Sequence, residues 1–323
     1  MASPNTSAYT RPDLGQMFSE FPIEAATQGF IATRIAPVFS VAEQAGVFPS
    51  LPIEVMLEQP ASTARAPKAG YVRGDWEFEQ GSYATVEHGA EEIMDDRLRK
   101  IYAYAIDFDR VCAARALGKV LRGFEIEVAA AMESTANFAG TTTATTAWTS
   151  HAAAVPIDDI QNALIAAEDA KGIKPNVMVI TSKTLNHLRR CAQVVDRIKY
   201  AGIDDPKMAP EATVLNMLAQ LLGVEEIFVA NRFKDSAKKG QTASLARIWT
   251  DSIVALHTVP RTSDLEEPCS ARTLIWSGDG AGPAGVFEQY REEGVRGDIM
   301  RFRHERQLKV LVGGAGYILT TVI

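Results

Sequence analysis

A chain of 323 residues is long enough for about two structural units with a substantial core. Hydrophobic residues make up 46% and charged residues 23%, close to the average of soluble globular proteins, which excludes global disorder. With 33 basic and 40 acidic residues the formal charge is -7. This balance argues against a dedicated nucleic-acid binder, but it leaves room for one basic face that contacts DNA loosely.

The cysteines and the first residues limit the class of protein further. Cys112, Cys191 and Cys269 are far apart, odd in number and outside any C-x-x-C pair, so neither a disulfide framework nor a zinc site is predicted. The N-terminal segment lacks the regions of a secretory signal, and no apolar run approaches the ~20 residues of a membrane span. We therefore expect a soluble protein that is made in the cytoplasm and has no membrane partner.

Residues 1–45 mix short apolar clusters with prolines and follow no long period, which predicts an extended arm with at most one short helix. Such an arm cannot bury its own apolar side chains. Phe18, Phe21 and Phe30 must therefore be covered by another part of this chain or by another chain.

Residues 46–92 place β-prone pieces on either side of a turn-rich, basic linker that carries Arg65 and Lys68. This pattern predicts a two-stranded β-hairpin with a long tip that projects from the body. A two-stranded hairpin is only marginally stable in water, so another element must lie against it.

From about Asp107 the apolar residues mostly recur at i, i+3, i+4 and i+7, which predicts a helix of seven or eight turns with Asp107 as its N-cap. At 1.5 Å per residue it is roughly 40 Å long and forms a spine for other elements. Its predicted core face consists of Phe108, Val111, Leu117, Leu121 and Phe124.

Basic residues run along the approach to this helix and along its length. They either face DNA or an acidic partner, or form salt bridges with neighbouring carboxylates, and the sequence leaves both interpretations open. The residues are Arg97, Arg99, Lys100, Arg110, Arg115, Lys119 and Arg122.

After a Thr/Ala/Gly-rich connection (136–156), which we predict as a loop or strand edge, residues 157–260 read as a compact α/β module. A helix ends at Gly172, a buried strand follows, and Ser182 is the predicted N-cap of one helix over "KTLNHLRRCAQVV". A further helix and strand precede "LARIWTDSIVALHTV", which predicts a hairpin-like pair of strands. Residues 261–323 then alternate charged and apolar residues, as a closing sheet with one polar face would.

A G-x-G-x-x-G sequence, Gly280 to Gly285, follows an apolar run and suggests a flavin- or NAD-binding enzyme as a minor alternative. Pro283 removes a backbone N–H where pyrophosphate binds, and Gly294 and Gly297 break the helix that must follow. A glycine-rich turn between strands is therefore the better interpretation.

The remaining polar groups carry no catalytic or metal-binding signature. The five histidines are isolated, and the acidic segment Glu87 to Asp96 lacks the spacing of a calcium loop, so we favour a solvated charged segment over a cation site. We expect no catalytic residue, no cofactor and no metal.

The order of these parts resembles that of the major capsid proteins of tailed bacteriophages. "IAPVFSVAEQAGVFPSL" resembles the arm entering the extended loop, "KPNVMVITSKTLNHLRR" and "LLGVEEIFVANRF" resemble axial-domain units, "IWTDSIVALHTVP" the following strand pair, and "GGAGYILTTVI" the end of the peripheral domain. The resemblance covers nearly the whole chain. It implies an α+β capsid fold with an N-terminal arm (1–45), an extended β-hairpin loop (46–92), a peripheral domain with the spine helix (93–156), an axial α/β domain (157–260) and a peripheral closing sheet (261–323).

The resemblance also implies a structural, non-enzymatic role: self-assembly through pentamers and hexamers into an icosahedral shell that encloses double-stranded DNA, in a virion assembled in the host cytoplasm. Bacterial encapsulins share the fold, so a protein nanocompartment is the alternative. Contacts between subunits are expected from Phe18, Phe21, Phe30, Arg65, Lys68, Tyr71 and Trp76.

Further implied partners are a portal and a decoration protein. Because the arm begins near Met1, we expect a separate scaffolding protein or none. Some proteins of this kind crosslink a loop Lys to a peripheral-domain Asn. Lys68 is suitably placed for this, but no Asn follows Asn231, so the acceptor is missing.

Overall fold

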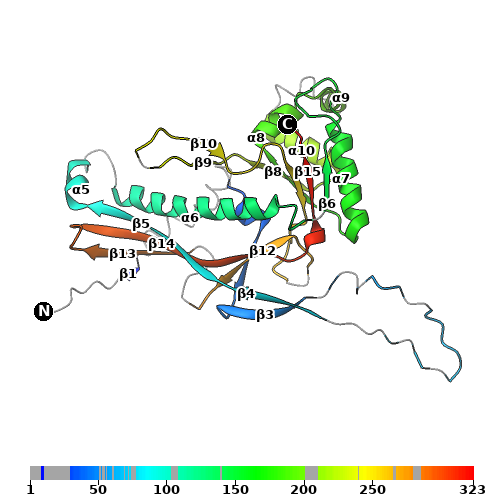
Figure 1. Cartoon of the computed structure of the whole chain (residues 1–323), viewed down its shortest axis with the longest axis horizontal. Helices are drawn as coiled ribbons and strands as arrows, with labels where there is room; N and C mark the ends of the chain where they lie inside the picture. Colours follow the sequence, from blue (N-terminus) through cyan, green and yellow to red (C-terminus); the bar gives the residue numbers. More distant parts are fainter. Residues whose placement is uncertain are drawn as a thin grey trace.

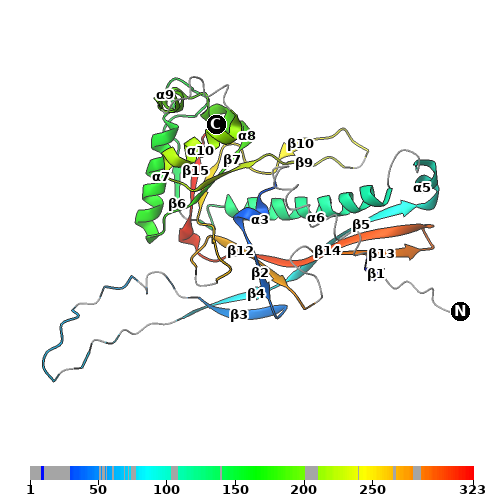
Figure 2. The ribbon, with the colours of Figure 1, turned by 180° about the vertical axis from the view of Figure 1, so that it is seen from behind.

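The computed structural model describes residues 9–10, 30–50, 52, 55, 57–59, 62–68, 70–71, 73, 78–102, 108–138, 140–200, 210–238, 240–264, 267–278 and 285–323. It is an α+β structure with an elongated part, in which one long helix lies along a sheet, and an α/β part at one end of that helix (Figure 1). A two-stranded β-hairpin leaves the elongated part near the end that carries the α/β part (Figure 2).

The elongated part is built on a mixed sheet that joins six strands among the described residues. Its order is β1-β13-β14-β12-β2, and β5 also pairs with β14. The strands are β1 (Tyr9–Thr10), β2 (Val38–Val41), β5 (Val86–Asp95), β12 (Ala271–Trp276), β13 (Val286–Glu292) and β14 (Gly297–Val310).

The helix α6 (Phe108–Met132) covers one face of this sheet and is the predicted spine helix. Alternate residues of β14, Met300 and Phe302, pack against Leu117 and its neighbours on α6, and the Phe302 ring lies 4.6 Å from the Phe287 ring. Strand periodicity sends the intervening residues to the other face, where Arg301 and Arg303 pair with Glu288. The closing strands thus have the predicted polar face.

The α/β part has its own five-stranded sheet, with the order β6-β15-β11-β7-β8. Its strands are β6 (Gly140–Thr143), β7 (Val177–Thr181), β8 (Glu226–Ala230), β11 (Val254–His257) and β15 (Gly316–Thr320), the last preceded by the 3-10 turn η1 (Gly313–Ala315). Its helices are α7 (Pro156–Lys171), α8 (Ser182–Leu188), α9 (Ala192–Tyr200) and α10 (Glu211–Leu222).

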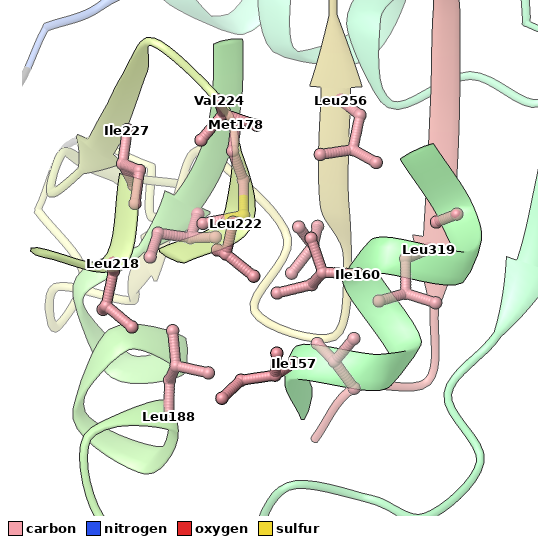
Figure 3. Close-up of a cluster of buried hydrophobic side chains, with 14 of the residues drawn as sticks. Ile157, Ile160, Met178, Leu188, Leu218, Leu222, Val224, Ile227, Leu256 and Leu319 are labelled. Carbon is pink, nitrogen blue, oxygen red and sulfur yellow. The ribbon is translucent and has the colours of Figure 1, made fainter. Parts of the chain in front are cut away.

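The core of this part forms where the helices meet the sheet, and Figure 3 shows its aliphatic side chains converging. Ile160 from α7, Met178 from β7 and Leu218 from α10 are all completely buried. Helix α7 ends at Gly172 and α10 at Gly223, both in the left-handed conformation that favours glycine. The predicted compact module is therefore present.

Several sequence-based expectations for this region are wrong in detail. The single helix over residues 183–195 is two helices, because the Ala192 N–H donates to the His151 carbonyl instead of continuing the helical ladder. Its N-cap is Thr181, whose side chain accepts from the Thr184 N–H, and not Ser182. The strands in "LARIWTDSIVALHTV" do not pair with each other: β10 (Leu245–Arg247) pairs with β9 (Phe233–Asp235), while β11 pairs with β7 and β15.

Two strands also lie in a different sheet from the one expected. The C-terminal strand β15 pairs with β11 and β6, so it closes the α/β sheet and not the peripheral sheet. Residues 86–92, predicted as part of the extended loop, belong to β5, because Ala90 and Met94 pack beneath α6. The acidic residues of this segment therefore lie on a paired strand.

The glycine-rich sequence of the dinucleotide hypothesis leads into a strand. Residues 279–284 lie outside the described residues, and Gly285 is followed directly by β13. A dinucleotide-binding turn requires a helix at this point. Gly285 has φ 80°, and a Cβ there would lie 2.5 Å from the Phe302 ring, so the position needs glycine for reasons of backbone geometry and packing.

Candidate functional site

The titratable groups do not assemble into a centre with obvious chemistry. The described residues contain no group of three His, Cys, Asp or Glu that could hold a metal ion. Burial raises the pKa of the Cys191 thiol to about 11 and lowers the pKa of His257 to about 3, so both are neutral at pH 7. No described helix is both long and apolar enough to cross a membrane. The features that stand out are instead surfaces and anchors.

The first anchor fixes the described end of the arm to the spine helix. The arm contains the short helix α3 (Ala32–Ile35) and then strand β2, which pairs in parallel with β12. The carboxylate of Glu125 on α6 is fully buried and accepts hydrogen bonds from the backbone N–H groups of Ile31 (3.1 Å) and Ala32 (2.9 Å) and from Trp249 Nε1 (2.5 Å).

This anchor joins three parts of the chain through one side chain. A carboxylate at the first turn of a helix satisfies donors that have no partner within the helix and suits the positive end of its dipole. Burial nevertheless raises the pKa of Glu125, while the bonds from Trp249, Ala32 and Ile31 oppose that rise. The helical pattern of the sequence assigns Glu125 to a face other than the apolar one, and its complete burial shows that this assignment is wrong.

Of the contact residues predicted in the arm, Phe30 is buried in this chain and the others lie outside the described residues. Phe30 is only 8% exposed, and the guanidinium of Arg232 stacks 4.1 Å from its ring, so this chain already covers it. The expectation that Phe30 awaits another subunit is therefore wrong. Phe18 and Phe21 lie outside the described residues, as does Trp76 of the loop.

The extended hairpin consists of β3 (Ala45–Ser50) and β4 (Glu79–Ala84), paired from Ala45 opposite Ala84 to Ser50 opposite Glu79. Neither strand has a buried residue, and Val47 is 65% exposed. Hydrophobic strands normally bury one face. This hairpin therefore lacks the cover that a two-stranded unit needs for stability.

The described residues of the loop beyond the hairpin are also exposed. Arg65 stacks on Tyr71 at 4.8 Å, yet Tyr71 remains 75% exposed, and Leu57 is 65% exposed. Lys68 is exposed in a left-handed turn with φ 70°. Arg65, Lys68 and Tyr71 thus lie together on the projecting loop, where another molecule can reach them.

An apolar hollow lies where the hairpin leaves the body. It encloses about 260 Å³ between the hairpin and strands β2 and β12. Its lining includes Phe39, Val41, Val47, Phe48, Tyr83, Leu274 and Leu311. The sequence interpretation did not find this hollow, because it depends on how the hairpin sits on the sheet.

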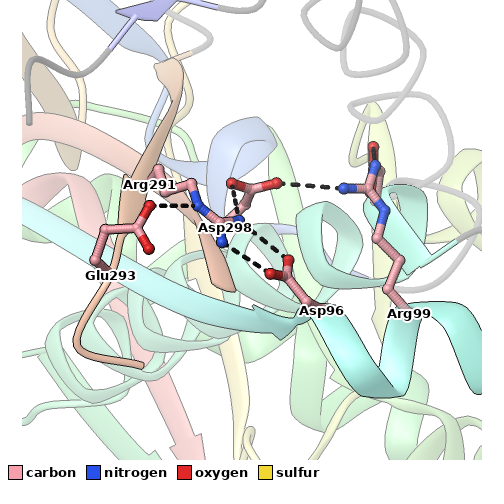
Figure 4. A network of polar contacts seen from close by, with 6 residues as sticks. Asp96, Arg99, Arg291, Glu293 and Asp298 are labelled. Carbon is pink, nitrogen blue, oxygen red and sulfur yellow. Dashed lines mark hydrogen bonds and ion pairs between the residues drawn. The ribbon is translucent and has the colours of Figure 1, made fainter. Parts of the chain in front are cut away.

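A network of ion pairs fixes the opposite tip of the elongated part (Figure 4). Arg291 on β13 holds both carboxylate oxygens of Asp96, at 3.0 and 2.8 Å, which is the strong bidentate arrangement and lowers the pKa of Asp96. Asp96 opens the helix α5 (Asp96–Tyr102). Asp298 at the start of β14 joins Arg291 to Arg99, and Arg99 reaches Asp109 on α6. The tip is thereby one connected unit.

The predicted core face of the spine helix is only partly correct. Leu117 and Phe124 are buried, and Leu121 packs at the margin of the core under α6. Val111 is 42% exposed, so its assignment to the core is wrong. The reason is its place on the helix, since it shares a row with Arg115 (i+4) and Arg122 (i+11) and not with Leu117. For Phe108 the structure describes the backbone alone.

Comparison with known proteins identifies the fold. No protein-family model matches the chain, and no curated protein sequence matches it. Among solved structures, a phage-related protein from Bordetella bronchiseptica is similar with a TM-score of 0.67 and 22% identity, over 98% of both chains. The capsid of a native GTA particle is similar with a TM-score of 0.57 and 15% identity, over 91% of both chains. The capsid of the cyanophage P-SCSP1u is similar with a TM-score of 0.56 and 14% identity, over 88% of this chain and 86% of the other.

The chain therefore has the fold of tailed-phage major capsid proteins, as its order of elements predicted. This chain contains the spine helix α6, the β3–β4 hairpin and the α/β part. Within it, the β3–β4 hairpin has no buried residue, and an apolar hollow lies at its base.

Proposed function

We propose that this chain is a major capsid protein, which assembles through pentamers and hexamers into an icosahedral shell around the double-stranded DNA of a tailed phage. The observation that carries the proposal is the β3–β4 hairpin, which has no buried residue on either strand in a fold shared with the capsids of a cyanophage and a GTA particle. A closed shell repeats heterologous contacts in rings, so each hairpin would be covered by a neighbouring subunit. The role is structural and without catalysis.

The proposal includes a five-part organisation with arm, extended loop, spine helix, peripheral sheet and axial α/β part, in which β5 belongs to the peripheral part and β15 to the axial part. A portal, a scaffolding protein and a decoration protein are the partners it implies, and the virion, assembled in the host cytoplasm, is the location. The proposal includes no crosslink through Lys68, since no Asn follows Asn231 in the sequence.

Removal of the loop tip tests the role of the hairpin. Deletion of Gln59 to Gly70 should leave the secondary structure and thermal unfolding of the subunit nearly unchanged, because the exposed loop contributes little to the core. The same deletion should abolish assembly in analytical ultracentrifugation. The variant Tyr71→Ser keeps the length of the loop and should weaken assembly through lost apolar contacts. Loss of monomer folding on deletion would refute the proposal's account of the loop.

The encapsulin alternative is decided by the contents of the particles. Nuclease-protected nucleic acid inside shells formed in the presence of the packaging machinery supports the phage head. Co-purification of one defined enzyme inside shells formed by this chain alone would favour a nanocompartment.

A further inference from the structure

The solvent face of α6 carries a row of basic side chains. Arg115, Lys119 and Arg122 lie within one row of the helix surface, outside the buried face that packs on the sheet, and we refer to them as the basic strip. Arg115 and Lys119 are 65% and 51% exposed at their side chains, and Arg122 is also exposed. The spacing follows the i, i+3, i+4 geometry that makes helical residues neighbours.

The carboxylates near the basic strip do not balance its charge. Arg115 Nε (3.4 Å) and Lys119 Nζ (2.5 Å) both pair with the same carboxylate, that of Glu92 on β5. Arg122 makes no ion pair with any carboxylate of the described residues. Its charge instead helps to lower the pKa of Arg232, after the larger effect of burial. An excess of positive charge on this face stands out in a chain whose formal charge is -7.

A glycine within the strip is not explained by the packing of the subunit. Gly118 lies on the same row, and a Cβ added there would meet no atom within 4 Å. Glycine inside a helix is destabilising relative to alanine because of its backbone freedom. A missing side chain at an open position lets a partner approach the helix backbone closely between flanking basic groups.

The side chains of the basic strip are better suited to contact the phosphates of a nucleic acid than to contact a protein surface. Protein interfaces are enriched in aromatic side chains at their centre, whereas the row from Val111 to Arg122 contains none. Lys and Arg on an open helix are typical of contacts to nucleic-acid phosphates, which need charge but no base recognition. We propose that the basic strip binds the phosphate backbone of double-stranded DNA without reading its sequence, and so marks the face of the subunit that lines the shell interior.

The assignment of the basic strip to the shell interior rests on the proposed function, whereas DNA binding by the strip does not. Fluorescence anisotropy with a 30-bp duplex, measured on the full unassembled chain between 50 and 300 mM NaCl, tests the strip directly. The triple variant Arg115→Gln, Lys119→Gln, Arg122→Gln should lower affinity about tenfold or more at 100 mM NaCl and reduce the log–log salt slope by about 2 to 3.

A matched control removes the same charge from the far α/β part. It carries Arg190→Gln, Arg197→Gln and Lys199→Gln, three exposed residues at or near α9, and should bind as the wild type does. An equal loss of DNA affinity in the control and strip variants overturns the proposal, and so does an unchanged salt slope in the strip variant. If the chain binds polyglutamate more tightly than a DNA duplex of the same total charge, the DNA proposal is also overturned, and an acidic protein partner is favoured instead. Should the triple variant unfold, Arg122→Gln alone must still reduce the slope by about 1.

Assembled particles test the assignment of the face. If the strip lines the interior, closed shells should bind added duplex DNA much more weakly than unassembled subunits do, and the strip variant should still form shells. Equal binding by closed shells and free subunits would place the strip outside. Absence of shells in the wild type would contradict the proposed function and leave the result for the free subunit intact.

Discussion

Replacement of Glu125 tests whether one buried carboxylate holds the arm to the spine helix. In Glu125→Ala the N–H groups of Ile31, Ala32 and Trp249 all lose their acceptor. Each buried donor without a partner costs about 1–3 kcal/mol, but the mutation also removes the cost of burying a charge. We expect a net loss of about 3–5 kcal/mol in the free energy of unfolding, which is a large part of the stability of a typical domain.

The isosteric variant Glu125→Gln separates charge from shape. The amide keeps one acceptor oxygen but turns an NH₂ group towards donors, so we expect a smaller loss of about 1–3 kcal/mol. Because burial raises the pKa of Glu125 in the folded protein, the folded state holds its proton more tightly than the unfolded state does. The stability that this proton contributes is present at low pH and is lost as the pH rises through the folded pKa. Glu125→Gln cannot show this change.

Urea unfolding of the unassembled chain measures the free energy, and amide hydrogen exchange at Ile31 and Ala32 reports on the arm. Both amides should exchange much faster in Glu125→Ala, while amides of Met178 and Leu218 in the α/β core should lose only the protection set by global stability. A change under 1 kcal/mol together with unaltered exchange at Ile31 and Ala32 would refute the anchor.

Three further predictions concern the core and the helix. His257 has a pKa of about 3 when folded against about 6.5 unfolded, so lowering the pH from 6.5 to 5 should cost about 2 kcal/mol in urea unfolding, and His257→Leu should remove this dependence. Gly118→Ala should stabilise the subunit by about 0.5–1 kcal/mol, since its Cβ meets no atom; a lower melting temperature would contradict this. Phe124→Ala should cost about 3–5 kcal/mol, because it empties a buried site under Arg306, and a loss below 1 kcal/mol would contradict the packing.

The elements that could be predicted from the sequence are those whose signals are local. The apolar residues of α6 repeat the helical period over several turns, so the helix could be predicted from the sequence, and Gly172 and Gly223 end helices as expected. The assignment of Val111 failed because one apolar residue near a helix end does not define a face. At that position only the neighbouring row of Arg115 and Arg122 indicates exposure.

Pairing between distant strands could not be predicted, because periodicity does not choose a partner. The apolar run of β15 suits a strand of either sheet, and its pairing with β11, Val254 opposite Leu319, and with β6 assigns it to the α/β part. The split between α8 and α9 depends on a hydrogen bond from Ala192 to His151, 41 residues earlier. The Glu125 anchor likewise requires α3, α6 and Trp249 to meet, which no stretch of the sequence contains.

Electron microscopy of the purified full chain, expressed alone and with a scaffolding protein, tests the central claim most directly. We predict closed icosahedral particles in which the β3–β4 hairpin of each subunit lies against the next subunit. A uniform population of monomers under every condition, with the hairpin still uncovered, would contradict the assignment of this chain as a shell subunit.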